Sequence, residues 1–278
     1  MITNAMSAAV GGMSAQATRF LHIGNNIANS STTGYKGNDA IFAETLALVS
    51  GSAPNGSRLQ PGAGVSVLGT ESDFTRGQII DDTDDYHLSI LGDGFFPVTL
   101  GGDDFVTRAG DFSLVPNPST APAAGGFVMM RPNGSILQGT TALGGGIVAG
   151  NAGAVHFDSA PTSIEIEVDG TITVQPGTVT ITNGFIGLKN YLNPDALIRD
   201  EAQMYIEDPQ ASPVDTANLI EPGTSNLGFL RQRSLEQSNV DLTNEFTKMI
   251  VTQRNFQANA KTITTADEML NVAINVKR

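Results

Sequence analysis

The chain of 278 residues contains no cysteine and no tryptophan, and it carries little charge. Without cysteine, disulfide bridges and thiolate metal sites are excluded. Charged residues make up only 15% of the chain, and the formal net charge of −13 disfavours nucleic acid and anionic membrane surfaces as partners. Low charge combined with 31 glycines is not typical of a disordered chain; it indicates a β-rich body with many turns.

Long apolar runs and a secretory signal are also lacking. No window approaches the ~18 apolar residues that a bilayer crossing needs, so we expect no membrane insertion. The first ten residues carry no lysine or arginine, and no purely apolar core follows them. If the protein leaves the cytoplasm, we expect a route that does not read such a signal.

Motifs of catalysis and cofactor binding are missing as well. Neither a Gly-x-Ser-x-Gly elbow nor a P-loop occurs, and His22, His87 and His156 lie far apart in the sequence. The acidic run at residues 81–85 lacks the glycine and glutamate that a calcium loop needs at its sixth and twelfth positions. A solvated turn is therefore favoured there, and we expect no enzyme activity, no cofactor and no metal.

What the chain does have is an apolar repeat at its C-terminal end. No proline or glycine follows Gly228, and Asp241 can cap the start of a helix. Alternating steps of four and three residues join a seam of Leu242, Phe246, Met249, Gln253, Phe256, Ala260, Ile263, Asp267, Leu270 and Ile274. This pattern predicts a long helix whose seam faces another helix.

A second stripe lies at the N-terminal end, over residues 3–28. Its members are Met6, Val10, Met13, Ala17, Phe20, Ile23 and Ile27. Gly11 and Gly12 interrupt the helix, at roughly 1 kcal/mol each relative to alanine. We therefore expect this helix to be weak alone, and to be stabilised by the C-terminal seam or by copies of itself. A further amphipathic segment is expected at residues 41–49.

Between the two ends the apolar pattern becomes strand-like. Residues 50–64 are rich in glycine and proline and predict a linker. Short alternating runs separated by turn signals predict an antiparallel β domain at residues 65–233, with a short insertion or hairpin region at 139–178. The clearest hairpin joins Ile164–Val168 to Thr171–Val174 through an Asp-Gly turn.

The predicted fold class is mainly β with terminal α-helices. Residues 1–49 and 234–278 are expected to form a coiled-coil-like inner domain, and the central antiparallel β domain lies between them in sequence. The outward side of the C-terminal helix carries threonine and asparagine rather than glutamate and lysine, which is unusual for a solvated face. The stripes can close a helical hairpin within one chain or build a core between subunits, and this coating favours the second interpretation.

Several motifs resemble those of the bacterial flagellar rod and hook proteins. The run Ile23–Lys36 (IGNNIANSSTTGYK) resembles the N-terminal signature of that family. Matches to its β-domain and C-terminal motifs follow in the family's order, at Asp73–Gly77, Leu88–Phe96, Phe105–Phe112, Ser238–Leu242 and Met249–Gln257. The resemblance therefore runs from end to end of the chain.

The resemblance implies a structural subunit that polymerises with copies of itself into a helical tube, the terminal helices forming the inner wall. Implied partners are the other flagellar axial proteins (rod, hook and hook–filament junction), the type III export apparatus and the hook cap. The implied location is the basal body or hook, from periplasm to exterior. Candidate interface residues are Met6, Val10, Met13, Phe20, Asn25, Asn26, Ile27, Asn29, Leu242, Phe246, Met249, Gln253, Phe256, Ile263, Leu270 and Ile274.

Within this family the sequence leaves alternatives open. The two ends resemble hook proteins most closely, so the first interpretation is a short hook subunit. However, residues 139–178 are too few for the outer domain that hook proteins usually carry there, and a distal rod protein is the alternative. A secreted β-rich adhesin is a remote one. The asparagines at positions 25, 26 and 29 fit either helix termination or contact between subunits.

Overall fold

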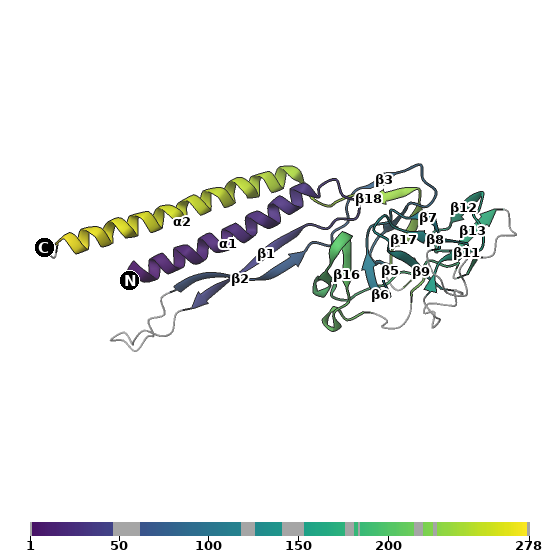
Figure 1. Cartoon of the computed structure of the whole chain (residues 1–278), viewed down its shortest axis with the longest axis horizontal. Coiled ribbons are helices and arrows are strands. Elements are labelled where there is room, and N and C mark those ends of the chain that lie inside the picture. Colours follow the sequence, from purple (N-terminus) through teal and green to yellow (C-terminus); the bar gives the residue numbers. More distant parts are fainter. Residues whose placement is uncertain are drawn as a thin grey trace. The chain divides into compact units, whose positions relative to one another are not determined.

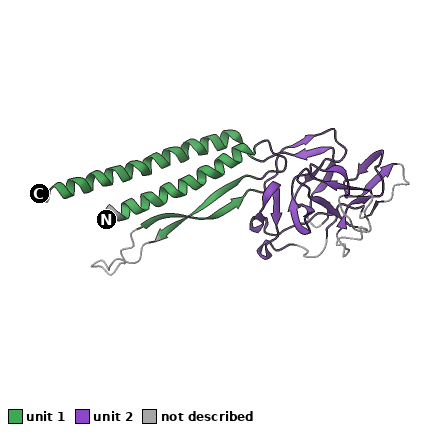
Figure 2. Ribbon diagram, in the orientation of Figure 1, with its two compact units in different colours: residues 1–30, 37–73, 240–278 green, residues 31–36, 74–239 purple. Residues whose placement is uncertain are grey.

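The computed structural model describes residues 2–46, 62–117, 126–140, 153–175, 181–182, 184–213, 219–224 and 227–276. The chain divides into two compact units (Figure 2). Unit 1 comprises residues 1–30, 37–73 and 240–278, and unit 2 comprises residues 31–36 and 74–239.

Unit 1 consists of two helices and a β-hairpin (Figure 1). Helix α1 spans Ile2–Ala28 and helix α2 spans Leu242–Val276, which confirms the two predicted terminal helices. Asp241 caps α2 as predicted, because its Oδ1 accepts hydrogen bonds from the backbone N–H of Thr243 at 2.8 Å and of Asn244 at 3.4 Å. Among the described residues, neither helix combines the length and hydropathy that crossing a bilayer requires.

The hairpin of unit 1 pairs β1 (Asn38–Leu46) with β2 (Gly62–Ser72) in antiparallel register. The sequence predicts an amphipathic segment at 41–49, and its described part is a strand. Such a short apolar run does not show whether the chain follows the helical or the strand period, so the sequence leaves the type of element open. Residues 50–61 of the expected linker lie outside the described residues, and from Gly62 onward the chain is already β2. The hairpin belongs to unit 1, so the division differs from the expected β domain at 65–233.

Unit 2 contains one large antiparallel sheet and three two-stranded sheets within its described residues. The large sheet has the order β14-β11-β8-β9-β5-β6-β16-β15, with β10 on β9 and β7 on β8. Its strands are β5 (Phe96–Leu100), β6 (Asp103–Thr107), β7 (Ser113–Pro116), β8 (Phe127–Met130), β9 (Ile136–Gly139), β10 (Gly153–Ala154), β11 (His156–Phe157), β14 (Ile181–Thr182), β15 (Ile198–Arg199) and β16 (Met204–Ile206). The prediction of a mainly antiparallel β body is confirmed.

The small sheets pair segments that are distant in sequence as well as near ones. β17 (Phe229–Gln232) pairs with β4 (Leu88–Leu91), and β18 (Ser234–Glu236) pairs with β3 (Ile79–Asp81). β12 (Ser163–Ile166) and β13 (Ile172–Gln175) form the predicted Asp-Gly hairpin. Three short 3-10 helices, η1 (Pro194–Ala196), η2 (Glu201–Gln203) and η3 (Pro209–Ala211), complete the described elements.

The core of unit 2 is built from the apolar sides of these strands. Fully buried members include Leu88, Ile90, Phe96, Phe112, Met129, Leu137, Phe157 and Ile186. A second, aromatic cluster surrounds Phe95, which lies edge-on to Phe74, Tyr191 and Tyr205. These two clusters make unit 2 a body with its own core.

Candidate functional site

The face on which α1 and α2 meet combines small and polar residues with a few larger apolar ones. The buried residues of α1 include Ala9, Gly12 and Ala15, and a Cβ built on Gly12 would lie 2.7 Å from Nδ2 of Asn259 on α2. A Cβ on Gly11 would lie 3.1 Å from the carbonyl oxygen of Val65 on β2. The two glycines that weaken an isolated helix are thus the places where neighbouring elements approach α1 closely.

The face that α2 turns toward α1 repeats every seven residues. Its buried or half-buried members are Glu245, Thr252, Asn259 and Ala266 in one column and Met249, Ile263 and Leu270 in the other. The predicted seam shares Met249, Ile263 and Leu270 with this face, but its exposed positions 242, 246, 253, 267 and 274 do not belong to it. The predicted coiled-coil-like contact is therefore not confirmed. Only part of the seam lies on this face, and Gly12 of α1 lies close to the polar Asn259 of α2.

Asn26 connects three elements of unit 1. Its amide nitrogen donates to the carbonyl oxygen of Asn38 at 2.8 Å and to Oε2 of Glu245 at 3.3 Å, and its oxygen accepts from the Asn38 N–H at 3.0 Å. The side chain of Asn29 bonds back to Asn25 within the last turn of α1. Contacts within the chain thus involve all three asparagines of the candidate cluster, of which Asn25 is exposed.

Charged groups surround the Asn26 contact. Lys248 donates to Oε1 of Glu245 at 2.8 Å and lies 3.7 Å from Asp39, which also pairs with Arg19 at 3.3 Å. Glu245 is nearly fully buried and was not singled out from the sequence. The sequence signal for this face is the spacing of seven residues that joins Glu245 to Thr252, Asn259 and Ala266.

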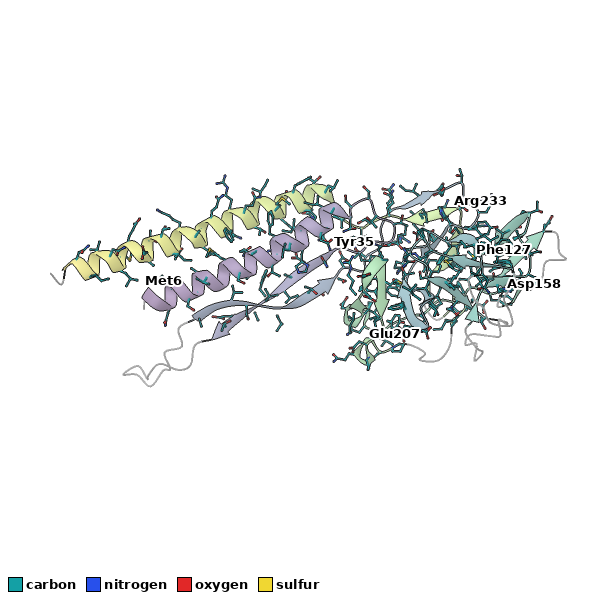
Figure 3. The ribbon with its side chains drawn as sticks, viewed as in Figure 1. Met6, Tyr35, Phe127, Asp158, Glu207 and Arg233 are labelled. Atoms are coloured by element: carbon teal, nitrogen blue, oxygen red, sulfur yellow. The ribbon has the colours of Figure 1, made fainter. Side chains whose placement is uncertain are left out.

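The apolar side chains that α2 leaves exposed lie on its other faces. Phe246 is 50% exposed and Ile250 is 59% exposed, and both are larger than any side chain of the buried polar column. Figure 3 shows side chains along the outer edge of α2 that project away from α1. Of the candidate interface residues, Val10, Phe20, Leu242, Phe246, Gln253, Phe256 and Ile274 are exposed, and Met6, Met13, Ile27, Met249, Ile263 and Leu270 are half-buried.

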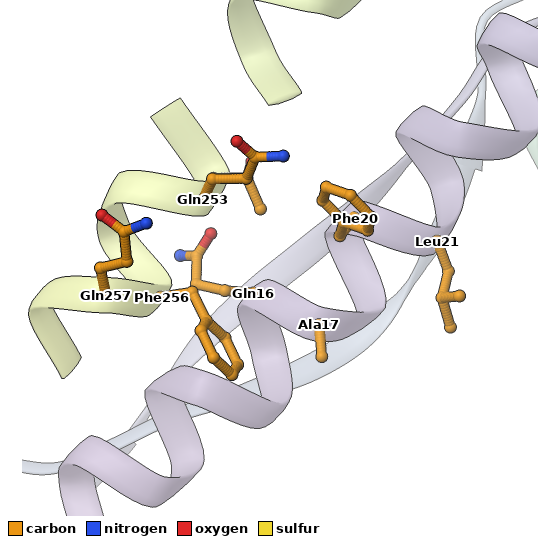
Figure 4. A pocket seen from close by; sticks show the side chains of 8 residues that line it. Gln16, Ala17, Phe20, Leu21, Gln253, Phe256 and Gln257 are labelled. Atoms are coloured by element: carbon orange, nitrogen blue, oxygen red, sulfur yellow. The ribbon is translucent and has the colours of Figure 1, made fainter. Parts of the chain in front are cut away.

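An apolar hollow of about 430 Å³ lies between the two helices (Figure 4). Its walls are Gln16, Ala17, Phe20 and Leu21 of α1 and Thr252, Gln253, Phe256 and Gln257 of α2. No lining residue is charged, although the chain carries a net charge of −13. An uncharged hollow bordered by two partly exposed phenylalanines suits apolar side chains rather than ions.

A buried ion cluster holds the ends of unit 2 together. Lys36 and Glu236 are fully buried, and their Nζ and Oε1 atoms lie 2.7 Å apart. Arg108 lies 3.7 Å from the other oxygen of Glu236 and donates to the carbonyl oxygen of Gly92 at 2.8 Å. Burial lowers the pKa of the Arg108 guanidinium, and the Glu236 carboxylate opposes that shift.

The ion cluster joins segments that lie far apart in the sequence. Lys36 ends the first family-like motif, Arg108 lies in a central one, and Glu236 precedes the C-terminal one. Spacing in the sequence predicts none of these contacts. A lysine and a glutamate that are both fully buried indicate a structural lock rather than a reactive site, since both charges are paired and hydrogen-bonded.

The acidic run at residues 81–85 forms a turn. Oδ1 of Asp82 accepts from the Thr83 N–H at 2.6 Å, and Oδ2 of Asp82 lies 3.0 Å from Nδ1 of His87. The Thr83 bond first, and His87 second, lower the pKa of the Asp82 carboxyl. Within the described residues, no group of three metal-ligating side chains comes together.

Two long helices with exposed apolar side chains and a β body with a buried ion cluster are typical of a protein that packs against other protein surfaces. Two family profiles match the chain. The profile described as "Flagella basal body rod protein" matches residues 6–36, and "Flagellar basal body rod FlgEFG protein C-terminal" matches residues 231–276.

Relatives match the chain over nearly its whole length. The flagellar basal-body rod protein FlgG of Bacillus subtilis (strain 168) is 32% identical over 97% of both chains. FlgG of Buchnera aphidicola subsp. Acyrthosiphon pisum is 31% identical over 93% of this chain and 94% of its own, and FlgG of Caulobacter vibrioides is 31% identical over 96% of both. The chain belongs to the flagellar rod and hook protein family and is a structural component of the bacterial flagellum.

Proposed function

We propose that this chain is a subunit of the flagellar rod that assembles with copies of itself into a straight tube. This replaces the first interpretation as a hook subunit, because the three relatives above are all named basal-body rod proteins. The short region at 139–178, of which a two-stranded hairpin is described, also supports a rod protein. Membership of a structural axial family leaves no support for an adhesin.

The observation that carries this proposal is the pair of exposed apolar faces in unit 1. Fully burying a phenylalanine or isoleucine contributes about 1.5–3 kcal/mol, so burying the exposed half of such a side chain contributes about 1 kcal/mol, and several of them per subunit favour association. The contact between α1 and α2 within one chain uses other sides of these helices, so it leaves the exposed apolar faces uncovered. Contacts between unlike surfaces of identical subunits form a ring when the rotation between subunits closes, and they extend into a helical tube when it does not.

The remaining partners follow from this role. Neighbouring axial proteins would meet the two ends of the tube, and the type III export apparatus and a cap would deliver and place subunits. In a rod, contacts between β bodies have to hold while torque passes through them. We therefore assign the candidate interface residues on α1 and α2, including Gln253 and Asp267 of the predicted seam, to contacts between subunits or to the lumen.

The test is polymerisation of the purified full-length chain, followed by sedimentation and electron microscopy. Ile250→Asp places a charge on an exposed apolar side chain, whereas Ile250→Leu is the matched control. We expect straight tubes from the parent and the leucine variant, and soluble chains with unchanged helix content from the aspartate variant. Tubes of normal length from Ile250→Asp would refute the role of this face, and curved tubes from the parent would restore the hook interpretation.

A further inference from the structure

Helices α1 and α2 run antiparallel in a constant register. Gly12 lies opposite Asn259, and Asn26 lies opposite Glu245, so fourteen residues separate the contact points on each helix. Extending this register by ten residues from Gly12 places Ile2 opposite Met269. The last described turns of α2, residues 270–276, therefore continue beyond the first described residue of α1, as Figure 1 also shows.

This extension of α2 is apolar and uncharged. Residues Asn271–Val276 contain no charged side chain, although the chain as a whole is acidic. Val272 is 62% exposed and Ile274 is 68% exposed. Ala273 lies seven residues after Ala266 and so continues the side of α2 that α1 covers lower down. The extension thus presents a helix side that the described residues of α1 do not cover.

The hollow between α1 and α2 has the matching chemistry. It lies in a groove between two helices, which is where a third helix packs, and its lining is also uncharged. Glutamines 16, 253 and 257 line it together with the two phenylalanines. Oε1 of Gln16 has no hydrogen-bond partner among the described residues, and Asn271 and Asn275 on the extension carry amide donors.

We propose that the extension of α2, residues 270–276, packs in the hollow between α1 and α2 of a second copy of this chain. The inference rests on the proposed self-assembly and specifies its contact. Hollow and extension are different surfaces of one molecule, so each copy offers both, and the contact repeats from copy to copy as a tube requires. Gln253 at the hollow and Ile274 on the extension are 21 residues apart on one helix, or about 30 Å at 1.5 Å per residue.

The test introduces two cysteines into the chain. Because the chain has no cysteine of its own, a thiol cross-linker reacts only at the introduced positions. Tubes assembled from the full-length double variant Gln253→Cys/Ile274→Cys are treated with a short bismaleimide. Because these positions are about 30 Å apart within one chain, a short linker joins them only between copies. We expect a ladder of covalent dimers, trimers and larger species, with the 253–274 link identified by mass spectrometry.

The matched control is Ala258→Cys/Ile274→Cys, in which Ala258 is an exposed residue of α2 outside the hollow. It is expected to give monomers and few dimers, as is Ile274→Cys alone. A ladder from the control as strong as from the test pair, or tubes of the test pair without the 253–274 link, overturns this contact but leaves self-assembly standing. Absence of any polymer from the parent chain overturns both.

Discussion

The buried ion cluster of unit 2 allows a quantitative test of how the chain is locked. Lys36 donates to Oε1 of Glu236 at 2.7 Å and to the carbonyl oxygen of Thr75 at 2.8 Å, and Gly77 N–H donates to the same Oε1 at 2.9 Å. In Lys36→Met the apolar stem remains but the positive charge is lost. The Glu236 carboxylate then keeps one N–H donor and the more distant Arg108, so its buried charge is poorly compensated.

The expected cost follows from that imbalance. Removing one partner of a buried ion pair typically destabilises a protein by about 3–5 kcal/mol, mostly because the other charge stays buried. Adding Glu236→Gln to Lys36→Met removes the carboxylate charge and keeps an oxygen for the Gly77 N–H, while Arg108 loses the carboxylate beside it. We therefore expect the two losses not to add: the double variant should lose about 2 kcal/mol less than the sum of the losses in Lys36→Met and Glu236→Gln, a coupling in the range found for residues in direct contact.

Tyrosine signals provide a selective assay. All four tyrosines, Tyr35, Tyr86, Tyr191 and Tyr205, lie in unit 2, and the chain has no tryptophan. Urea unfolding followed by tyrosine fluorescence therefore reports unit 2, while circular dichroism at a helix wavelength is dominated by α1 and α2. A loss below about 1 kcal/mol in Lys36→Met, or single losses that simply add in the double variant, would refute the reasoning.

Three further perturbations have defined outcomes. Gly12→Leu should destabilise the helices of unit 1 by about 1–3 kcal/mol, because its Cβ would approach Asn259 to 2.7 Å; Gly24→Ala, where a Cβ meets nothing within 4 Å, should stabilise α1, and equal thermal shifts would contradict the close approach. Burial raises the pKa of Tyr205 to about 12, so its stabilising contribution holds below pH ~10 and is lost as pH rises toward ~12, about 3 kcal/mol in all; Tyr205→Phe should lack that part of the alkaline loss in urea titrations. Ala17→Phe fills the hollow and should block tube formation in sedimentation assays while leaving helix content unchanged, and normal tubes would contradict a seated partner.

Much of the fold could be predicted because its signals are local. The Asp241 cap, the absence of helix breakers after Gly228 and the Asp-Gly turn before β13 each act over a few residues. The stretch 185–191 also looks like a strand in sequence, yet with the part of the chain that the structure describes it forms isolated bridges, for example between Leu188 and Ile220. Alternation predicts an extended backbone there, and the partner decides whether a ladder forms.

The remaining features depend on contacts between distant residues. Lys36 and Glu236 are two hundred residues apart, and no rule of spacing pairs them. The predicted start of the β domain at residue 65 differs from the start of unit 2 for the same reason, since β2 looks like the first strand of the β body until its partner, β1, is known. The pairing of β18 with β3 likewise joins segments that sequence patterns treat separately.

The heptad pattern of α2 is present in the sequence, but only part of the predicted seam lies on the face that α2 turns toward α1. The large apolar residues at heptad spacing include Leu242, Phe246 and Ile274, and all three are exposed in the single chain. The contact within the chain instead uses Gly12 and residues such as Thr252, since close approach of two backbones favours small side chains. In a subunit that assembles, the most hydrophobic stripe is free to serve the contact between copies, and periodicity alone does not distinguish that contact from packing within the chain. The positions that begin with Glu245 identify the packing within the chain. A buried carboxylate needs fixed hydrogen-bond partners, and Asn26 and Lys248 of the same chain supply them before and after assembly.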